Sequence, residues 1–169
     1  DDYYVIWTTT PWTIPSNEAV CLNDNLEYAE VQTEKGKLVF LAKFVDQLLE
    51  KFHLENQGVL RTFKGRELEG ITYHHVVLDK ECPTLLGKHV TDEDGTGVVH
   101  TAGGHGLDDF LVCAKYGIAP INTVDYQGNM NEEAGKYQGM FFEDCSKAVI
   151  HDMNEKGCLL AVENITHSY

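Results

Sequence analysis

This sequence of 169 residues has few basic residues and no long apolar run. Its 13 lysines and arginines stand against 27 aspartates and glutamates, a formal net charge of −14. Proteins that bind nucleic acid over a broad surface are normally basic, so we expect no DNA partner, although a local site for one nucleic-acid end stays open. No stretch approaches the ~20 apolar residues of a membrane-spanning helix, so we expect no membrane partner either.

The five cysteines are far apart and form no Cys-x-x-Cys pair. This excludes the spacing of a zinc ribbon or a thioredoxin motif and predicts reduced thiols in a cytoplasmic protein. The sequence also has no Gly-x-Ser-x-Gly nucleophile elbow. Gly135 and Lys136 do not complete a phosphate-binding loop, because Tyr137 stands where that loop needs serine or threonine. We predict no cofactor.

Short hydrophobic segments predict a mixed α/β, β-rich fold with a β-barrel core and peripheral helices. Helices are expected at residues 43–52, 108–116 and 144–156. Strands are expected at residues 3–10, 19–22, 28–33, 37–41, 59–64, 73–78, 98–100, 118–124 and 159–164. With no internal repeat and no linker, residues 1–169 are expected to form a single domain, and its abrupt ends suggest a piece excised from a larger protein.

The most informative stretch is residues 100–110, which read HTAGGHGLDDF. Three glycines in four positions, between a strand and a helix, predict a tight turn that presents side chains into a cleft. Asp108 is expected to cap the helix that follows. This leaves Asp109 free to bind a cation such as an ammonium group.

Two other functions fit the same residues. A metal-dependent hydrolase would use His100, His105 and Asp109, which are suitable ligands. The two histidines are five positions apart rather than two, and no histidine follows Asp109, so we predict no metal. The other alternative is a non-catalytic module that binds an amino acid or one nucleic-acid acceptor end, because the sequence offers no clear nucleophile or general base.

A second stretch, residues 7–15, reads WTTTPWTIP. Together the two stretches resemble the editing domain of isoleucyl-tRNA synthetases, and the likeness covers essentially the whole chain. The chain departs from that family at Gly103, where proline is common. The resemblance implies a β-barrel with surrounding helices that hydrolyses valine wrongly attached to tRNA(Ile), with valyl-adenylate as a further candidate substrate. The implied partners are the valine-carrying 3′ end of tRNA(Ile) and the rest of the synthetase chain.

The resemblance also implies roles for individual residues. Asp109 would hold the α-ammonium group of the valyl ester. Thr8, Thr9 and Thr10 would shape the pocket and position the substrate or the attacking water. His100 would narrow the pocket against isoleucine. The acceptor end or the side-chain pocket would be lined by Trp7, Trp12 and Thr13.

Overall fold

The computed structural model describes residues 2–93 and 95–160. Its strands are β1 (Asp2–Tyr4), β2 (Ala19–Leu22), β3 (Glu27–Thr33), β4 (Gly36–Leu41), β5 (Val59–Lys64), β6 (Thr72–His74), β7 (Glu81–Leu86) and β8 (Val99–Thr101). Its α-helices are α1 (Val45–Lys51), α2 (Leu107–Lys115) and α3 (Phe142–Glu155). Short 3-10 helices are η1 (Pro11–Ser16), η2 (Ala42–Phe44), η3 (Gly65–Leu68) and η4 (Glu132–Tyr137). Among these described residues, no helix is long and apolar enough to cross a membrane.

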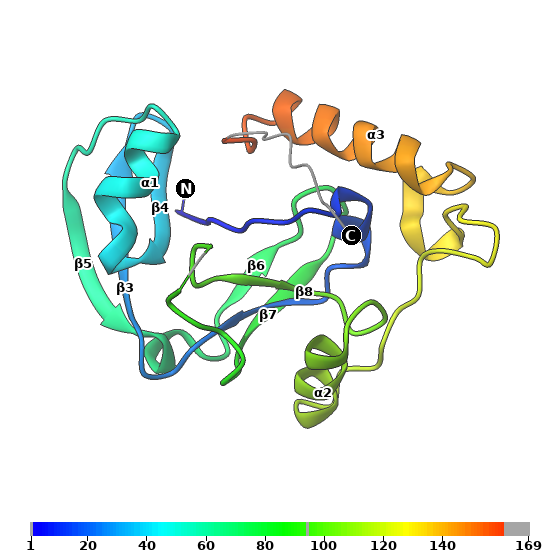
Figure 1. Ribbon diagram of the computed structural model, residues 1–169, viewed down its shortest axis with the longest axis horizontal. Helices are drawn as coiled ribbons and strands as arrows, with labels where there is room; N and C mark the ends of the chain where they lie inside the picture. Colours follow the sequence, from blue (N-terminus) through cyan, green and yellow to red (C-terminus); the bar gives the residue numbers. More distant parts are fainter. Residues whose placement is uncertain (1, 94, 161–169) are drawn as a thin grey trace.

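The strands form two four-stranded mixed sheets, drawn at the left and the centre of Figure 1. The strand order is β1-β4-β3-β5 in the first sheet and β6-β7-β2-β8 in the second. β1 runs parallel to β4 and β2 runs parallel to β7, whereas the other neighbours are antiparallel. The β-rich mixed α/β class with peripheral helices is confirmed. Within residues 2–93 and 95–160, however, the β core is two separate sheets rather than a closed barrel.

Alternate side chains of β4 and of β2 contact different neighbours, and these contacts define the layers of the molecule. Leu38 and Phe40 of β4 pack against α1, whereas Val39 and Leu41 pack against the second sheet. On β2, the even-numbered side chains face the first sheet and the odd-numbered ones pack with Val112 of α2. Because successive side chains of a strand point to opposite faces, the order is α1, first sheet, second sheet and α2.

The N-terminal segment leaves the first sheet after β1 and reaches η1 beside α3 (Figure 1). Ile14 of η1 packs in one buried cluster with Cys145 and Val149 of α3. The backbone N–H of Trp12 donates to Ser146 Oγ on α3 at 3.2 Å. α3 therefore supports the segment that carries the threonine run.

Most expected elements are present. The strands at residues 19–22 and 59–64 have the expected bounds. Those expected at 28–33 and 37–41 begin one residue earlier, and the one expected at 98–100 is shifted by one residue at both ends. All three expected helices form, each displaced by one or two residues at its start. The strand expected at residues 3–10 ends already at Tyr4. Of the strand expected at residues 159–164, positions 161–164 lie outside the described residues.

The structure differs from the expected strands at two places. The strand expected at residues 118–124 is absent, apart from one isolated bridge at Val124. Pro120 has no N–H to donate, and the N–H of Ile121 donates to the Glu18 carboxylate instead of a neighbouring strand. Conversely, β7 was not expected. It carries Pro83 inside a central strand, where proline argues against strand assignment.

A buried histidine ends β6, four residues earlier than the sequence suggests. The His75 side chain is 1% exposed, and its Nε2 donates to the Ile14 carbonyl at 3.0 Å. Its Nδ1 accepts the N–H groups of Val77 and Leu78 at 3.1 and 3.0 Å. Burial lowers the pKa of His75 to about 4, so the neutral ring ties η1 to the turn after β6.

We expect the free energy of unfolding to fall as the pH drops from about 6.5 towards about 4. In this window the unfolded chain binds a proton at His75 that the folded chain excludes, and each such proton costs up to about 1.4 kcal/mol per pH unit. The free energy of unfolding, measured with denaturant between pH 7.5 and pH 4, should depend less steeply on pH in His75→Gln than in the parent. The control is His74→Gln. The hydrogen bond that His74 donates to Asp79 raises the pKa of this exposed histidine, so removal of His74 cannot make the free energy of unfolding depend less steeply on pH. An equal slope in His75→Gln and the parent would contradict the prediction.

Candidate functional site

The two stretches singled out in the sequence meet at one cavity. The cavity has a volume of about 420 Å³ and is lined by Thr8, Thr10 and Thr13 from the first stretch and by His100 and Asp109 from the second. This is within the size range of small-molecule sites, about 300–1,000 Å³. We call it the threonine cavity. Trp7, which is 54% exposed, also lines it.

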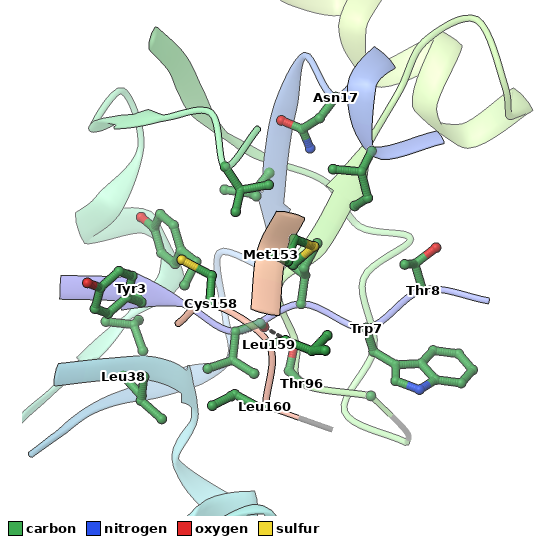
Figure 2. Close-up of a pocket in the computed structure, with 18 of the residues that line it drawn as sticks. Tyr3, Trp7, Thr8, Asn17, Leu38, Thr96, Met153, Cys158, Leu159 and Leu160 are labelled. Atoms are coloured by element: carbon green, nitrogen blue, oxygen red, sulfur yellow. Dashed lines mark hydrogen bonds between the residues drawn. The ribbon is translucent and has the colours of Figure 1, made fainter. Parts of the chain in front are cut away.

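Thr9 and Trp12 line a different and larger cavity, which Trp7 and Thr8 share. Figure 2 shows Trp7 and Thr8 at one end of this larger cavity and Tyr3 at the other end. Trp7 and Thr8 thus line both cavities, whereas Thr10 and Thr13 line only the threonine cavity of the two. Six of the eight expected site residues line the threonine cavity, whereas Thr9 and Trp12 do not.

Side-chain hydrogen bonds shape the threonine run. Thr8 Oγ1 accepts the backbone N–H of Thr10 at 3.0 Å, a local bond of the kind that competes with sheet pairing. Thr13 Oγ1 donates to the Thr10 carbonyl at 2.8 Å. The hydroxyl oxygens of Thr8 and Thr10, and those of Thr10 and Thr13, are each 3.3 Å apart. The run is therefore a cluster of hydroxyls at the cavity and not the end of an extended strand.

A chain of hydrogen bonds fixes the tautomer of His100. The Asn17 amide nitrogen donates to Nδ1 at 2.6 Å, so Nε2 carries the ring hydrogen and donates to Thr13 Oγ1 at 3.0 Å. Asn17 Oδ1 in turn accepts the hydroxyl of Tyr73. Burial, and then the nearby His105, lowers the pKa of His100 to about 4. The imidazole is therefore neutral at pH 7 and held at both nitrogens.

Asp109 turns back from the first turn of α2 towards the glycine-rich turn. Its Oδ2 accepts the backbone N–H of Ala102 at 3.0 Å. Within the described part of the chain this is the one hydrogen bond that Asp109 accepts, so Oδ1 is available to a bound donor. The residue at the N-cap of α2 is Gly106, and no side chain caps the helix, so the expectation that Asp108 caps it is wrong.

The glycines of the turn serve close packing rather than an unusual backbone conformation. None of Gly103, Gly104 and Gly106 has a positive φ. A Cβ added at Gly104 would lie 2.3 Å from the carbonyl oxygen of Ile121, so a side chain there would displace that segment. The turn is bent by contacts with its surroundings, and glycine permits those contacts.

Comparison of the sequence with known proteins decides the family. The chain is 47% identical over 167 residues to the isoleucine–tRNA ligase of Symbiobacterium thermophilum, and 46% identical over 165 residues to that of Acholeplasma laidlawii. These alignments cover 99% and 98% of the chain. The chain belongs to the isoleucine–tRNA ligase family. It spans 18% of the length of these two ligases, and no family model matches it.

Solved structures agree on the fold of this ligase segment. It superimposes on the crystal structure of GlLeuRS-CP1 with a TM-score of 0.79, covering 96% of this chain and 84% of that one at 13% identity. With the editing domain of the P. knowlesi cytosolic leucyl-tRNA synthetase, the TM-score is 0.69, with coverages of 92% and 83% at 12% identity. The ligase segment therefore has the fold of synthetase editing domains.

The residues of the metal alternative have other partners in this ligase segment. In the described ranges, no three His, Cys, Asp or Glu side chains converge as a metal site. The His105 ring meets Trp12 edge-on with centroids 5.3 Å apart, and its Nε2 lies 3.4 Å from Thr123 Oγ1. The hydrogen bonds of His100 and Asp109 likewise go to protein groups.

Three residues of the site escaped the sequence analysis. Asn17 holds His100, and Glu18 accepts two backbone N–H groups at the glycine-rich turn. His89 lines the threonine cavity, and its buried Nε2 has no hydrogen-bond partner among the described residues. Asn17 and Glu18 could have been suspected, because they follow the threonine-rich stretch directly. No sequence pattern distinguishes His89.

We expect Asn17→Asp to reverse the tautomer of His100. A carboxylate cannot donate to Nδ1, so it would draw a proton onto that nitrogen and raise the pKa of His100 from about 4 to above about 6. Nitrogen-15 NMR of labelled histidine, followed through a pH titration, reports both the tautomer and the pKa. Asn154→Asp on the exposed side of α3 is the control. A His100 in Asn17→Asp that still titrates near its original pKa would refute the proposed hydrogen-bond chain.

Proposed function

We propose that the chain is a post-transfer editing domain that hydrolyses valyl-tRNA(Ile). The observation that carries the proposal is the shared cavity, because one carboxylate with a free oxygen and a cluster of threonine hydroxyls line the same space. Membership of the isoleucine–tRNA ligase family and the fold of synthetase editing domains support it. Valyl-adenylate, which carries the same aminoacyl group, is a further candidate substrate.

The first part of the mechanism is recognition of the charged end of the amino acid. The Asp109 carboxylate binds the α-ammonium group of the valyl ester through Oδ1, while Oδ2 stays on the Ala102 N–H. Hydrogen bonds between ionised groups are about twice as strong as neutral ones. This contact therefore orients the ester in the cavity.

The second part is the attack of water on the ester. Of the Thr8 and Thr10 hydroxyls, one accepts a hydrogen bond from a water and the other donates one to the ester carbonyl oxygen, which places the water oxygen against the carbonyl carbon. The bond between that carbon and the ribose oxygen breaks, and the products are valine and tRNA with a free terminal hydroxyl. No covalent enzyme intermediate is needed, because orienting water against a reactive ester supplies much of the rate.

The third part is selection against isoleucine. A pocket built to activate isoleucine rejects valine only weakly, so a second site that admits only the smaller side chain is required, and isoleucyl-tRNA synthetase is itself the standard example of this principle. His100 supplies one wall of that second site. Thr13 contributes to the same wall because its hydroxyl accepts the His100 Nε2–H.

The remaining expected residues act at the edge of the site in this proposal. Trp7 lines both cavities and is half exposed, which suits stacking against the terminal nucleotide of the tRNA. Thr9 and Trp12 face the larger cavity, so we assign them to support of the segment rather than to contact with the ester. The 3′ end of tRNA(Ile) and the rest of the ligase chain are the proposed partners.

We expect Asp109→Asn to lower kcat/KM for deacylation of valyl-tRNA(Ile) by roughly 10- to 100-fold, since a hydrogen bond to a charged group is worth about 1.5–3 kcal/mol. Asparagine keeps an oxygen for the Ala102 N–H and removes the charge. The matched control is Asp46→Ala, which removes an exposed acid from the first turn of α1. The assay uses the full ligase that contains this segment and purified valyl-tRNA(Ile).

Two outcomes would contradict the proposal. If Asp109→Asn deacylates as fast as the parent, the carboxylate does not hold the ammonium group. If the parent binds valyl-tRNA(Ile) without hydrolysing it, the segment is a binding module and not an editing hydrolase.

A further inference from the structure

A second carboxylate lies behind the glycine-rich turn, outside the groups that the proposed mechanism uses. The Glu18 side chain is 6% exposed. Its Oε1 accepts the backbone N–H of Gly103 at 3.2 Å and that of Ile121 at 3.2 Å. The backbone N–H of Glu18 donates to the Thr101 carbonyl at 2.8 Å. One buried residue therefore holds three segments together: the entry to β2, the turn after β8 and the loop after α2.

Removal of this carboxylate from water costs free energy. Burial raises the pKa of Glu18, against the two backbone hydrogen bonds and the charge of Lys80, which lower it. A buried carboxylate needs hydrogen bonds that offset the cost of its removal from water. Here they hold the segment on which Asp109 depends.

The contacts of Glu18 and Asp109 are adjacent in the chain. Asp109 accepts the N–H of Ala102, and Glu18 accepts the next N–H, that of Gly103. Ile121, the second donor to Glu18, also presses its carbonyl oxygen against Gly104. If Glu18 releases its two donors, the turn loses its fixed distance from the 121 loop, and Asp109 loses the frame that aims it into the cavity.

We propose that Glu18 is a positioning residue for editing, which acts by clamping the glycine-rich turn whose Ala102 N–H holds the Asp109 carboxylate. This inference rests on the proposed editing function and adds a residue to it. Glu18 touches no substrate. Its effect is to keep the Asp109 carboxylate at the place where it meets the ammonium group, and a displacement of about 1 Å at such a group can cost roughly 100-fold in rate.

The test compares three variants of the full ligase that contains this segment. Glu18→Ala removes the acceptor and leaves two buried N–H groups without a partner. Glu18→Gln keeps an oxygen in the same place. Glu30→Ala removes another carboxylate that is also 6% exposed but lies on β3, where it pairs with Arg61 at 3.3 Å, away from the threonine cavity. For each variant, kcat and KM for deacylation of valyl-tRNA(Ile) are measured below the lowest Tm of the set.

We expect Glu18→Ala to lower kcat/KM by roughly 10- to 100-fold, Glu18→Gln to stay within a few-fold of the parent, and Glu30→Ala to deacylate normally even where its Tm falls as far. Hydrogen exchange of the Gly103 and Ile121 amides should accelerate in Glu18→Ala only. Wild-type deacylation by Glu18→Ala, or equal losses in Glu18→Ala and Glu30→Ala, would overturn the inference and leave the editing function standing. A parent ligase without deacylase activity would overturn both, and that result is visible before any substitution is made.

Discussion

The pairing of β2 with β8 is the constraint on which the site depends. Val20 stands opposite His100 and Ala19 opposite Thr101, so the residues just before β2 lie beside the turn just after β8. This register places Asn17 against the His100 ring. A slip of one residue would send His100 to the other face of the sheet, towards α2, and would separate it from the threonine run.

His100 and His105, which line the site, are uncharged near pH 7. Burial lowers the pKa of His105 as well as that of His100, so both rings are neutral near pH 7 and neither competes with a bound ammonium group for Asp109. The threonines that line the cavity add hydroxyl dipoles and no charge. The acidic side chains that line the cavity are Asp108 and Asp109, and a carboxylate in such a partly enclosed space interacts more strongly with a cation than the same group does in water.

The sequence predicts best the strands whose own residues favour extended structure. β2 appears with its expected bounds because it is a continuous apolar run. β5 does so because its valine, threonine and phenylalanine favour a strand and because Gly58 and Gly65 flank it. The expected strand after α2 fails because the N–H of Ile121 is satisfied by the carboxylate of Glu18, a partner more than a hundred residues away. Sequence periodicity contains no record of such long-range side-chain acceptors, and β7 was missed because Pro83 masks its pattern.

In the candidate site, too, the sequence identifies some features and the folded structure decides the others. The two motifs identify the residues, but the side that each residue faces depends on hydrogen bonds that only the folded chain supplies. Thr8 and Thr10 face the threonine cavity and Thr9 does not, because the Thr8 hydroxyl holds the Thr10 N–H and turns the segment out of the strand. Asp108 and Asp109 look equivalent in sequence, and the Ala102 N–H distinguishes them.

The size filter proposed for this cavity would depend on rigidity more than on attraction. One extra methylene changes the favourable burial energy by only about 1 kcal/mol, so attraction discriminates poorly between valine and isoleucine. A wall that cannot move discriminates better, because a close-packed surface that must yield to an extra methylene incurs strain of about 1–3 kcal/mol. The His100 ring is held at Nδ1 by Asn17 and at Nε2 by Thr13, so it cannot swing aside without breaking both hydrogen bonds. The hydrogen-bond chain that sets its tautomer is therefore also what would make it an effective barrier.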